Sequence, residues 1–465
     1  MINVDLIIKN IMIVTVNDQR ELINNGFVAI KDKKFVAIGK TEDLEAEYIA
    51  DKIIDGEGKA LFPGFISLHS HLFQNALKGL GRDKSLFDWL DSSVRKAYGF
   101  INYDLILAAA TAGCLENLNT GATTVLDYQY CHAHELGLDD AVVEAFKRTG
   151  IRGILGRGHT KVVNYPGLPP CPIDETEDMF FADVDRLMND LKDNDLISLA
   201  LAPGIIWDLS TEGFKKCAEY SRKYNMPVTM HTLESIDDDI FSLEKYGMTT
   251  MEFLETTGVL SERFIGVHCV QMNESDFNIF KKYNISVCHC PVSNMILGSG
   301  FAPVPRMIAE GLNVGLGADG SASSDTQNML EHLKAASLVH KANMVDPKVM
   351  SAETVIEMAT INGAKALGMA DKTGSIEIGK LADCFIFSPN TLSSCPVADP
   401  IAAIVYSSEP DNIETVIVGG EIVKENNVLT SYSKEEAIKD LAKRAKDLRE
   451  EVSLIETKWG QVSTL

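Results

Sequence analysis

Residues 61–74 read Leu-Phe-Pro-Gly-Phe-Ile-Ser-Leu-His-Ser-His-Leu-Phe-Gln, an apolar run that ends in His69 and His71. In a β-strand, residues two apart point to the same face, so both imidazoles would reach one point at the strand's end. One strand would then offer two nitrogens to a metal ion. A His-x-His also occurs by chance, and for this stretch alone two unrelated loop histidines remain the alternative.

The region around this stretch, residues 59–370, alternates apolar runs with helix-like segments. The apolar runs predict eight strands, at residues 60–69, 122–128, 151–157, 197–202, 227–231, 264–268, 285–289 and 313–319. Helices are predicted at residues 103–119, 141–149, 182–192, 211–223, 274–283 and 304–310. This rhythm is typical of an α/β fold of the (β/α)₈ TIM-like barrel type. A doubly wound open sheet has the same periodicity and stays the alternative.

Both flanks of this region read as short strands. In residues 1–58 we expect strands at 4–14, 27–31 and 34–38, and in residues 371–430 at 382–387, 401–406, 415–418 and 421–423. The last of these follows a Gly419-Gly420 hairpin turn. Neither flank is long enough to bury a good core alone, so we expect one small β-sandwich built from both termini. Residues 431–465 should form a C-terminal helix and tail, with Ser433 as N-cap and Glu436 completing a capping box.

The composition narrows the classes of function. The 465 residues are 45% hydrophobic and 23% charged, with a formal net charge of -23. Nucleic acids and anionic membranes are bound through clustered Lys and Arg, so this charge argues against both and suits a neutral or cationic small-molecule substrate. We find no apolar run near the roughly 20 residues that span a bilayer and no signal-peptide pattern at the start. A cytoplasmic protein is expected, and its nine cysteines, which lack paired spacing, should stay reduced.

The predicted strands end in side chains that can bind a metal. In a barrel the active site lies at the C-terminal ends of the strands. Five of the ten histidines and one aspartate fall there: His69, His71, His231, His268, His289 and Asp319. Glu234 follows His231 by three residues and could move protons beside a metal-held substrate. His268 could be a further ligand or could hydrogen-bond the attacking water, and His289 is as readily structural as functional.

Motifs of several other cofactor-binding and catalytic sites do not apply to this sequence. Residues 315–320, Gly-Leu-Gly-Ala-Asp-Gly, match the dinucleotide pattern G-x-G-x-x-G, but an eighth barrel strand has no parallel strand left for the βαβ unit that this pattern requires. The nucleophile elbow, the phosphate loop and the small zinc deaminase motif are missing from the sequence. The predicted strand at 197–202 has no lysine that could bridge two metals, which favours one metal ion.

Six motifs follow one another along the chain: Pro-Gly-Phe-Ile-x-x-His-x-His, His-x-x-Glu, Gly-x-His-Cys, His-Cys-Pro-x-Ser-Asn, Gly-x-Gly-x-Asp-Gly and Gly-Lys-Leu-Ala-Asp at 379–383. Together they resemble the amidohydrolase superfamily, in its mononuclear aminohydrolase and chlorohydrolase branch. The resemblance covers nearly the whole chain. It implies that one divalent metal ion, zinc first and iron as the alternative, is bound by His69, His71, His231 and Asp319. It also implies that His268 contacts the attacking water, that Glu234 moves protons, and that the protein is a dimer or larger homo-oligomer.

Shorter segments of the sequence resemble two different groups of enzymes within this branch. The 8-oxoguanine deaminases and their triazine-hydrolysing relatives are resembled by residues 167–170, Arg157-Gly158, residues 294–300 and residues 319–325. Residues 86–90 and 338–341 look like the S-adenosylhomocysteine and methylthioadenosine deaminases. Tyr128, Tyr130 and His159 depart from the 8-oxoguanine deaminase pattern, in segments where a substrate ring would bind.

The resemblance and the ligand set imply hydrolytic deamination of a ring amidine, C–NH₂ to C=O, with release of ammonia. We expect an 8-oxoguanine, guanine, isocytosine or pterin-like ring, with adenosine-type nucleosides as the alternative. In this mechanism Asp319 takes the water's proton. Gln74, Trp89 and Arg157 are the expected substrate contacts, although each could instead be structural. A triazine chlorohydrolase or alkylaminohydrolase, and a non-catalytic binding protein on the same scaffold, are the other readings.

Overall fold

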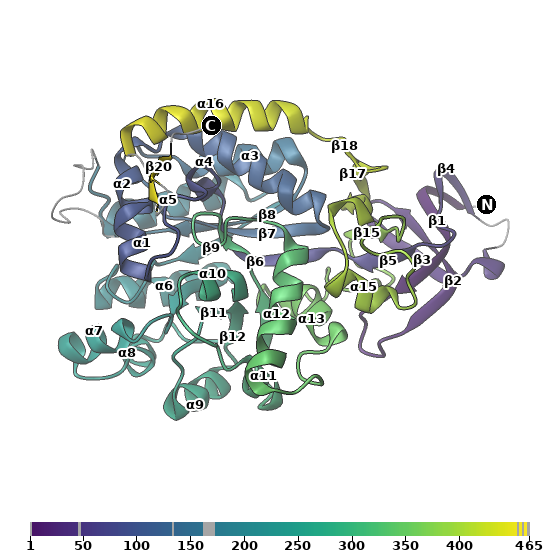
Figure 1. Cartoon of the computed structure of the whole chain (residues 1–465). Helices are drawn as coiled ribbons and strands as arrows, with labels where there is room; N and C mark the ends of the chain where they lie inside the picture. Colours follow the sequence, from purple (N-terminus) through teal and green to yellow (C-terminus); the bar gives the residue numbers. More distant parts are fainter. Residues whose placement is uncertain are drawn as a thin grey trace.

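The barrel expected from the central region is present in the computed structural model, which describes residues 2–44, 48–132, 134–160, 173–452, 455–457 and 460–462. Among these residues one sheet has the order β13-β12-β11-β10-β9-β8-β7-β6-β14, with all neighbours parallel. β13 and β14 are two pieces of the eighth strand, and β14 pairs with β6, which closes the barrel (Figure 1). The strands are β6 (Phe65–His71), β7 (Ala122–Gln129), β8 (Arg152–Gly158), β9 (Ile197–Ala202), β10 (Val228–Thr232), β11 (Phe264–His268), β12 (Ser286–His289), β13 (Val314–Leu316) and β14 (Asp319–Gly320).

Helices cover the outside of the barrel, and local capping signals fix where they begin. In α6 the Ser210 hydroxyl accepts from the Gly213 amide at 3.0 Å, and the helix ends at Asn225 in the left-handed region. The helices of the barrel region are α1 (Leu86–Ser92), α2 (Val94–Ala97), α3 (Tyr103–Asn119), α4 (Asp139–Thr149), α5 (Glu177–Asp190), α6 (Thr211–Tyr224), α7 (Asp237–Tyr246), α8 (Thr250–Thr257), α9 (Glu274–Tyr283), α10 (Pro291–Ile296), α11 (Val304–Ala309), α12 (Met329–Met344), α13 (Ala352–Ala359) and α14 (Ile361–Ala366).

Strands from both ends of the chain form the second large sheet, at the right of Figure 1, as expected. Its order is β18-β17-β16-β15-β5-β1-β2-β3, and β4 pairs with β1. Alternate residues of β2 enter two different apolar clusters, Val28 and Ile30 in one and Phe27 and Ala29 in the other, so both faces of the sheet are covered. The strands are β1 (Ile2–Val14), β2 (Leu22–Lys31), β3 (Lys34–Lys40), β4 (Tyr48–Asp55), β5 (Ala60–Pro63), β15 (Cys384–Phe387), β16 (Ile413–Val418), β17 (Glu421–Glu425) and β18 (Val428–Leu429).

Two of the expected strands differ from those in the structure. The apolar run 60–69 is divided, because β5 pairs with β1 and β15 in the terminal sheet and β6 starts the barrel at Phe65. Between them a Cβ on Gly64 would lie 2.0 Å from the Thr123 hydroxyl, so this passage from sheet to barrel needs glycine. The strand expected at 401–406 is wrong: these residues form α15 (Pro400–Tyr406), and Asp399 caps it by accepting from the amides of Ile401 and Ala402.

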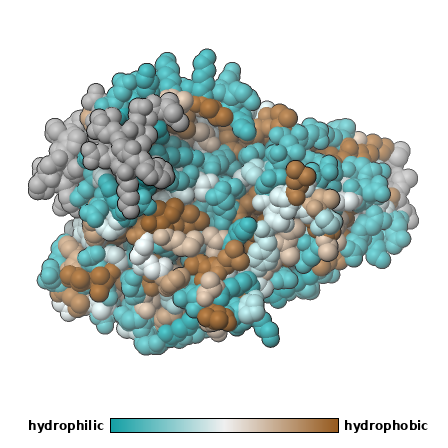
Figure 2. All heavy atoms as spheres, viewed as in Figure 1, coloured by the Kyte–Doolittle hydropathy of each residue, from teal (hydrophilic) through white to brown (hydrophobic). Residues whose placement is uncertain are grey.

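The chain continues into α16 (Lys434–Val452), which lies along α3 (Figure 1), and into a small hairpin, β19 (Ile455–Thr457) and β20 (Gly460–Val462). The expected N-cap is confirmed, since the Ser433 hydroxyl accepts from the Glu436 amide at 3.2 Å. Figure 2 shows hydrophilic side chains along α16 and apolar ones in separate patches elsewhere. None of the described helices has the length and apolar character needed to cross a membrane.

Candidate active site and metal centre

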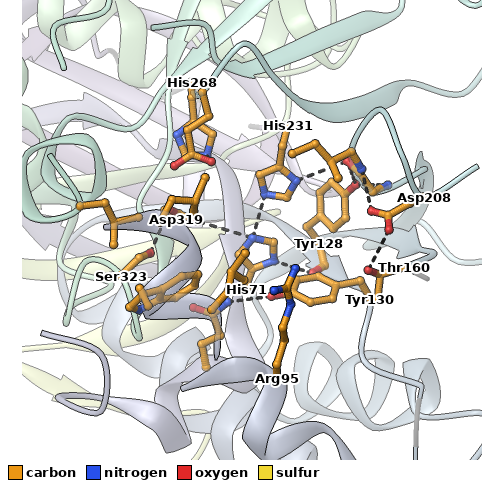
Figure 3. A pocket seen from close by; sticks show the side chains of 18 of the residues that line it. His71, Arg95, Tyr128, Tyr130, Thr160, Asp208, His231, His268, Asp319 and Ser323 are labelled. Atoms are coloured by element: carbon orange, nitrogen blue, oxygen red, sulfur yellow. Dashed lines mark hydrogen bonds and ion pairs between the residues drawn. The ribbon is translucent and has the colours of Figure 1, made fainter. Parts of the chain in front are cut away.

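A cavity opens at the C-terminal ends of the barrel strands (Figure 3). With its open mouth included, the cavity measures about 790 Å³. Much of its wall is apolar or aromatic, from Leu86, Trp89, Leu90, Tyr98, Trp207 and Leu297. Its polar lining includes five of the predicted site residues: His71, His231, Glu234, His268 and Asp319. The structure therefore brings together residues that lie up to about 250 positions apart in the chain.

His71 and His231 face each other across this site. The Nδ1 atom of His71 lies 2.8 Å from the carbonyl oxygen of Tyr128, and that of His231 lies 3.4 Å from the carbonyl oxygen of Gly204. A carbonyl oxygen only accepts, so each ring carries its proton on Nδ1 and presents a lone pair at Nε2. The two Nε2 atoms are 3.1 Å apart. Two lone pairs at this distance repel each other unless a cation lies between them.

His69 and Asp319 complete the cluster. His69 is fully buried, and within the described part of the chain neither of its ring nitrogens makes a hydrogen bond. Its Nε2 lies 3.3 Å from Oδ1 of Asp319, which is also 3.5 Å from Nε2 of His71. Ligand atoms within 4.8 Å of one another form two overlapping sets, His69 with His71 and Asp319, and His69 with His231 and His268. Three or four imidazoles with one carboxylate suit Zn²⁺ and Fe²⁺, so the residues fit a divalent metal.

Burial keeps these imidazoles neutral, as metal ligands must be. Loss of hydration lowers the pKa of His71 to about 3 and lowers the pKa of His69 and of His231. The neighbouring histidines act in the same direction on His71 and His231.

Glu234 and His268 form a second pair within the cavity. Glu234 is buried on the loop after β10, and its Oε2 lies 3.6 Å from Nε2 of His268. Nδ1 of His268 is 2.9 Å from Oδ1 of Asn294, an acceptor, so it donates there and leaves Nε2 to accept in the cavity. Loss of hydration raises the pKa of Glu234. A carboxyl that holds its proton more tightly than usual is suited to general acid catalysis.

Two of the three expected substrate contacts line the cavity. The Gln74 amide donates to the Tyr130 hydroxyl at 3.1 Å, and the Trp89 indole donates to the carbonyl of Ala322 at 2.7 Å. Each side chain is therefore held by a hydrogen bond while one side of it faces the cavity.

Arg157 is the exception, because it does not line the cavity. Its guanidinium is only 1% exposed and forms ion pairs with Asp183 at 2.8 Å, with Asp139 at 3.2 Å and with Glu175. The positive charge of Arg157 is thus neutralised by three buried or half-buried carboxylates outside the cavity lining. The same Glu175 also contacts His159, at 3.0 Å from Nδ1.

His289, left open between a structural and a functional role, lies away from the cavity lining. Its Nε2 is 3.2 Å from Nε2 of His340 on α12. Residues 167–170, part of the resemblance to 8-oxoguanine deaminases, lie outside the described residues.

Sequence reasoning missed several lining residues, namely Arg95, Tyr98, Thr160, Trp207 and Asp208. Thr160 follows β8 by two residues, and Trp207 and Asp208 lie on the loop after β9. The rule that barrel loops after strands build the site could have found these three. Arg95 and Tyr98, on or beside the short helix α2, had no such signal.

Comparison with known proteins identifies the family of this chain. The model of the amidohydrolase family matches residues 60–423. The chain belongs to the amidohydrolase family. It is a hydrolase of the amidohydrolase type, and the family supports a divalent metal at the histidine cluster.

Relatives within the family cover nearly the whole chain. A 5-methylthioadenosine/S-adenosylhomocysteine deaminase from Acetivibrio thermocellus is 32% identical over 448 residues, covering 95% of this chain and 99% of the relative. A 5′-deoxyadenosine deaminase from Methanobrevibacter smithii is 29% identical over 458 residues, covering 96% and 98%.

Solved structures agree with the fold. An adenosine deaminase from Xanthomonas campestris with bound zinc superposes with a TM-score of 0.89 at 25% identity, covering 96% of this chain and 99% of that one. An atrazine chlorohydrolase from Arthrobacter aurescens complexed with zinc gives a TM-score of 0.85 at 26% identity, covering 95% and 100%.

Proposed function

We propose that this amidohydrolase is a metal-dependent hydrolytic deaminase that replaces the amino group of a nitrogen heterocycle with a carbonyl oxygen and releases ammonia. The observation that carries the proposal is the buried Glu234 carboxyl, 3.6 Å from His268, in the cavity that the histidine cluster lines. A proton donor, a hydrogen-bond acceptor and a set of metal ligands therefore surround the same cavity.

His69, His71, His231 and Asp319 would hold one divalent ion, with zinc as our first choice. When bound, such an ion supplies Lewis acidity that makes water more acidic near neutral pH. Two observations support this ligand set: the Nε2 lone pairs of His71 and His231 face each other, and the buried His69 ring makes no hydrogen bond to any residue that the structure describes.

The chain's own residues would then divide the proton transfers. Nε2 of His268 accepts a hydrogen bond from the attacking water and holds it in line with the ring carbon. An oxygen of Asp319 takes the water's proton, while the Ser323 hydroxyl, 2.9 Å from Oδ2, fixes the carboxylate. Glu234 gives its proton to the ring nitrogen, takes the proton of the new C–OH group as the C=O bond forms, and passes it to the departing amine, which is too basic to leave as an anion. The proton held by Asp319 then restores the Glu234 carboxyl.

For the substrate we propose a 6-aminopurine nucleoside that is modified at the 5′ position. This class was the alternative in the sequence analysis. Two relatives named for it, deaminases of 5-methylthioadenosine or S-adenosylhomocysteine and of 5′-deoxyadenosine, match 95% and 96% of this chain. The apolar wall formed by Leu86, Trp89 and Trp207 could cover a purine ring and an apolar 5′ group.

One observation favours the amino-oxo rings that the sequence analysis put first. Arg95, whose guanidinium also pairs with Asp91 at 2.6 Å, lines the cavity and could donate to a ring carbonyl oxygen, a group that adenine lacks. Guanine, 8-oxoguanine, isocytosine and pterins therefore stay as the second candidate class.

The test is the ammonia released from both classes by the same metal-loaded preparation. We expect 5′-methylthioadenosine, S-adenosylhomocysteine or 5′-deoxyadenosine to have the highest kcat/KM. A higher kcat/KM for an amino-oxo ring would reverse the order of the two classes. In that case Arg95→Met should raise KM for the ring, because the donor to its carbonyl is lost.

A further inference from the structure

Tyr128 contacts three of the predicted metal ligands at once. It lies at the C-terminal end of β7 and is fully buried. Its ring centroid is 4.8 Å from that of His231, 5.3 Å from that of His71 and 5.5 Å from that of His69. Figure 3 shows the ring beside His71 and His231, on the side of the site where Thr160 and Asp208 lie. The proposed mechanism gives this residue no role.

Its two polar groups reach two different histidines. The backbone carbonyl of Tyr128 accepts from Nδ1 of His71 at 2.8 Å. The phenol hydroxyl donates to the carbonyl of Gly204 at 2.8 Å, and the Gly204 amide also contacts that hydroxyl. The same Gly204 carbonyl accepts from Nδ1 of His231 at 3.4 Å. One tyrosine is thus connected directly to His71 and, through one carbonyl, to His231.

Gly204 lies in a closely packed part of the loop after β9. Gly204 has φ +81°, and a Cβ there would lie 2.2 Å from Oδ2 of Asp208 and 2.5 Å from the carbonyl oxygen of His159. Only glycine fits this point of the loop after β9. The Tyr128 hydroxyl bonds to the N–H and the C=O of Gly204, which belong to two successive peptide units. At the other end of the second unit the Ile205 amide donates to Oδ2 of Asp208 at 2.9 Å, so the hydroxyl holds the oxygen end of the peptide that faces His231.

We propose that Tyr128 is a positioning residue for the metal centre. Its hydroxyl fixes the Gly204 carbonyl that sets the tautomer and ring orientation of His231, and its own carbonyl does the same for His71. Without the hydroxyl, the 3.4 Å contact of His231 loosens and its ring can take the tautomer that carries a proton on Nε2. That proton would occupy the place of the metal. This inference rests on the proposed metal function.

The experiment measures metal affinity, not turnover. Tyr128→Phe removes the hydroxyl and keeps the ring and the backbone carbonyl. Metal-free protein is titrated with Zn²⁺ against a chromogenic chelator, for wild type, for Tyr128→Phe and for Tyr130→Phe. Tyr130 is the matched control, because its ring also borders His71 but its hydroxyl bonds to Gln74. We expect about 10- to 100-fold weaker Zn²⁺ binding for Tyr128→Phe and a change below about threefold for Tyr130→Phe.

Further readouts separate positioning from general loss of structure. Thermal unfolding of the metal-free proteins should give the same midpoint for Tyr128→Phe as for Tyr130→Phe, so that only metal affinity distinguishes them. Zn²⁺ affinity of Tyr128→Phe within threefold of wild type overturns the proposal. If the wild type itself binds no Zn²⁺, the proposed function fails instead.

A measurement on the unaltered protein keeps the proposal testable if Tyr128→Phe does not fold. In zinc-loaded protein labelled with ¹⁵N at histidine, His71 and His231 should each carry a proton on Nδ1. A proton on Nε2 of either ring overturns the proposal.

Discussion

Replacing Glu234 by Gln separates proton transfer from metal binding. Gln keeps the shape of the side chain and can still meet the Ser299 hydroxyl, which donates to Oε1 at 3.5 Å. What it loses is the titratable proton that Glu234 would deliver to the ring nitrogen. The metal should stay, because Glu234 belongs to neither set of converging ligand atoms.

The size of the effect follows from the place of Glu234. Its carboxyl lies 3.6 Å from His268, and burial raises its pKa, so the substitution removes a proton donor from a buried position in the site. General acid–base catalysis by one positioned side chain contributes about 10²- to 10⁴-fold, or about 3–5 kcal/mol in the activation barrier. We therefore expect kcat to fall by that factor while KM changes little.

The assay is ammonia release under saturating substrate, with metal content measured on the same samples. Glu255→Gln is the control, since Glu255 pairs with Lys282 at the surface, where such pairs contribute little. Glu234→Gln with more than a tenth of the wild-type kcat would refute the proton-shuttle role. Loss of metal from Glu234→Gln would mean that this side chain is a ligand instead.

Three further substitutions test the surroundings of the site. Arg157→Met should lower the free energy of unfolding, measured in urea, by about 3–5 kcal/mol, because it leaves buried carboxylates without their cation. A variant of unchanged stability with a raised KM would show instead that Arg157 binds the substrate. Burial raises the pKa of Asp127 to about 7, so the folded state holds its proton more tightly and wild-type stability declines as pH rises from about 4 through 7. Asp127→Asn should lack that decline, so its free energy of unfolding relative to that of wild type should increase by up to about 4 kcal/mol between pH 4 and pH 8. Equal pH dependence of the two proteins would contradict this. Arg152→Met should destabilise the fold by about 3–5 kcal/mol, since Arg152 binds the buried Asp383 through two hydrogen bonds of 2.9 and 3.1 Å; unchanged unfolding in urea would show that this link between barrel and terminal sheet is dispensable.

The barrel and the histidine cluster could be predicted because both depend on strand ends. Parallel strands deliver their C-terminal residues to one rim, so His69, His231 and Asp319 meet although they are far apart in the chain. The division of the run 60–69 could not be predicted from periodicity, because β5 and β6 are equally apolar and only their pairing partners differ. For α15 a signal was present, since Asp399 followed by Pro400 is a helix start, but its apolar residues also suit a strand.

Contacts between loops were harder to predict than ligands. Arg157 was expected to contact the substrate because a guanidinium can hold a carbonyl oxygen, yet its guanidinium is bound by carboxylates from α4, α5 and the segment before α5. Nothing in the local sequence indicates which side of the strand's end the long side chain will take. The role of Tyr128 likewise depends on Gly204, 76 positions away, which only the fold brings to its hydroxyl.

Deamination by this protein should require a metal ion held by His69, His71, His231 and Asp319. The most direct measurement is ammonia release by metal-free protein as Zn²⁺ is added, with a panel of adenosine-type nucleosides, amino-oxo rings and aminotriazines. We expect no ammonia release without metal and full activity on one group of substrates at about one Zn²⁺ per chain. Equal ammonia release by the metal-free protein, or full metal occupancy with no ammonia from any substrate, would contradict it.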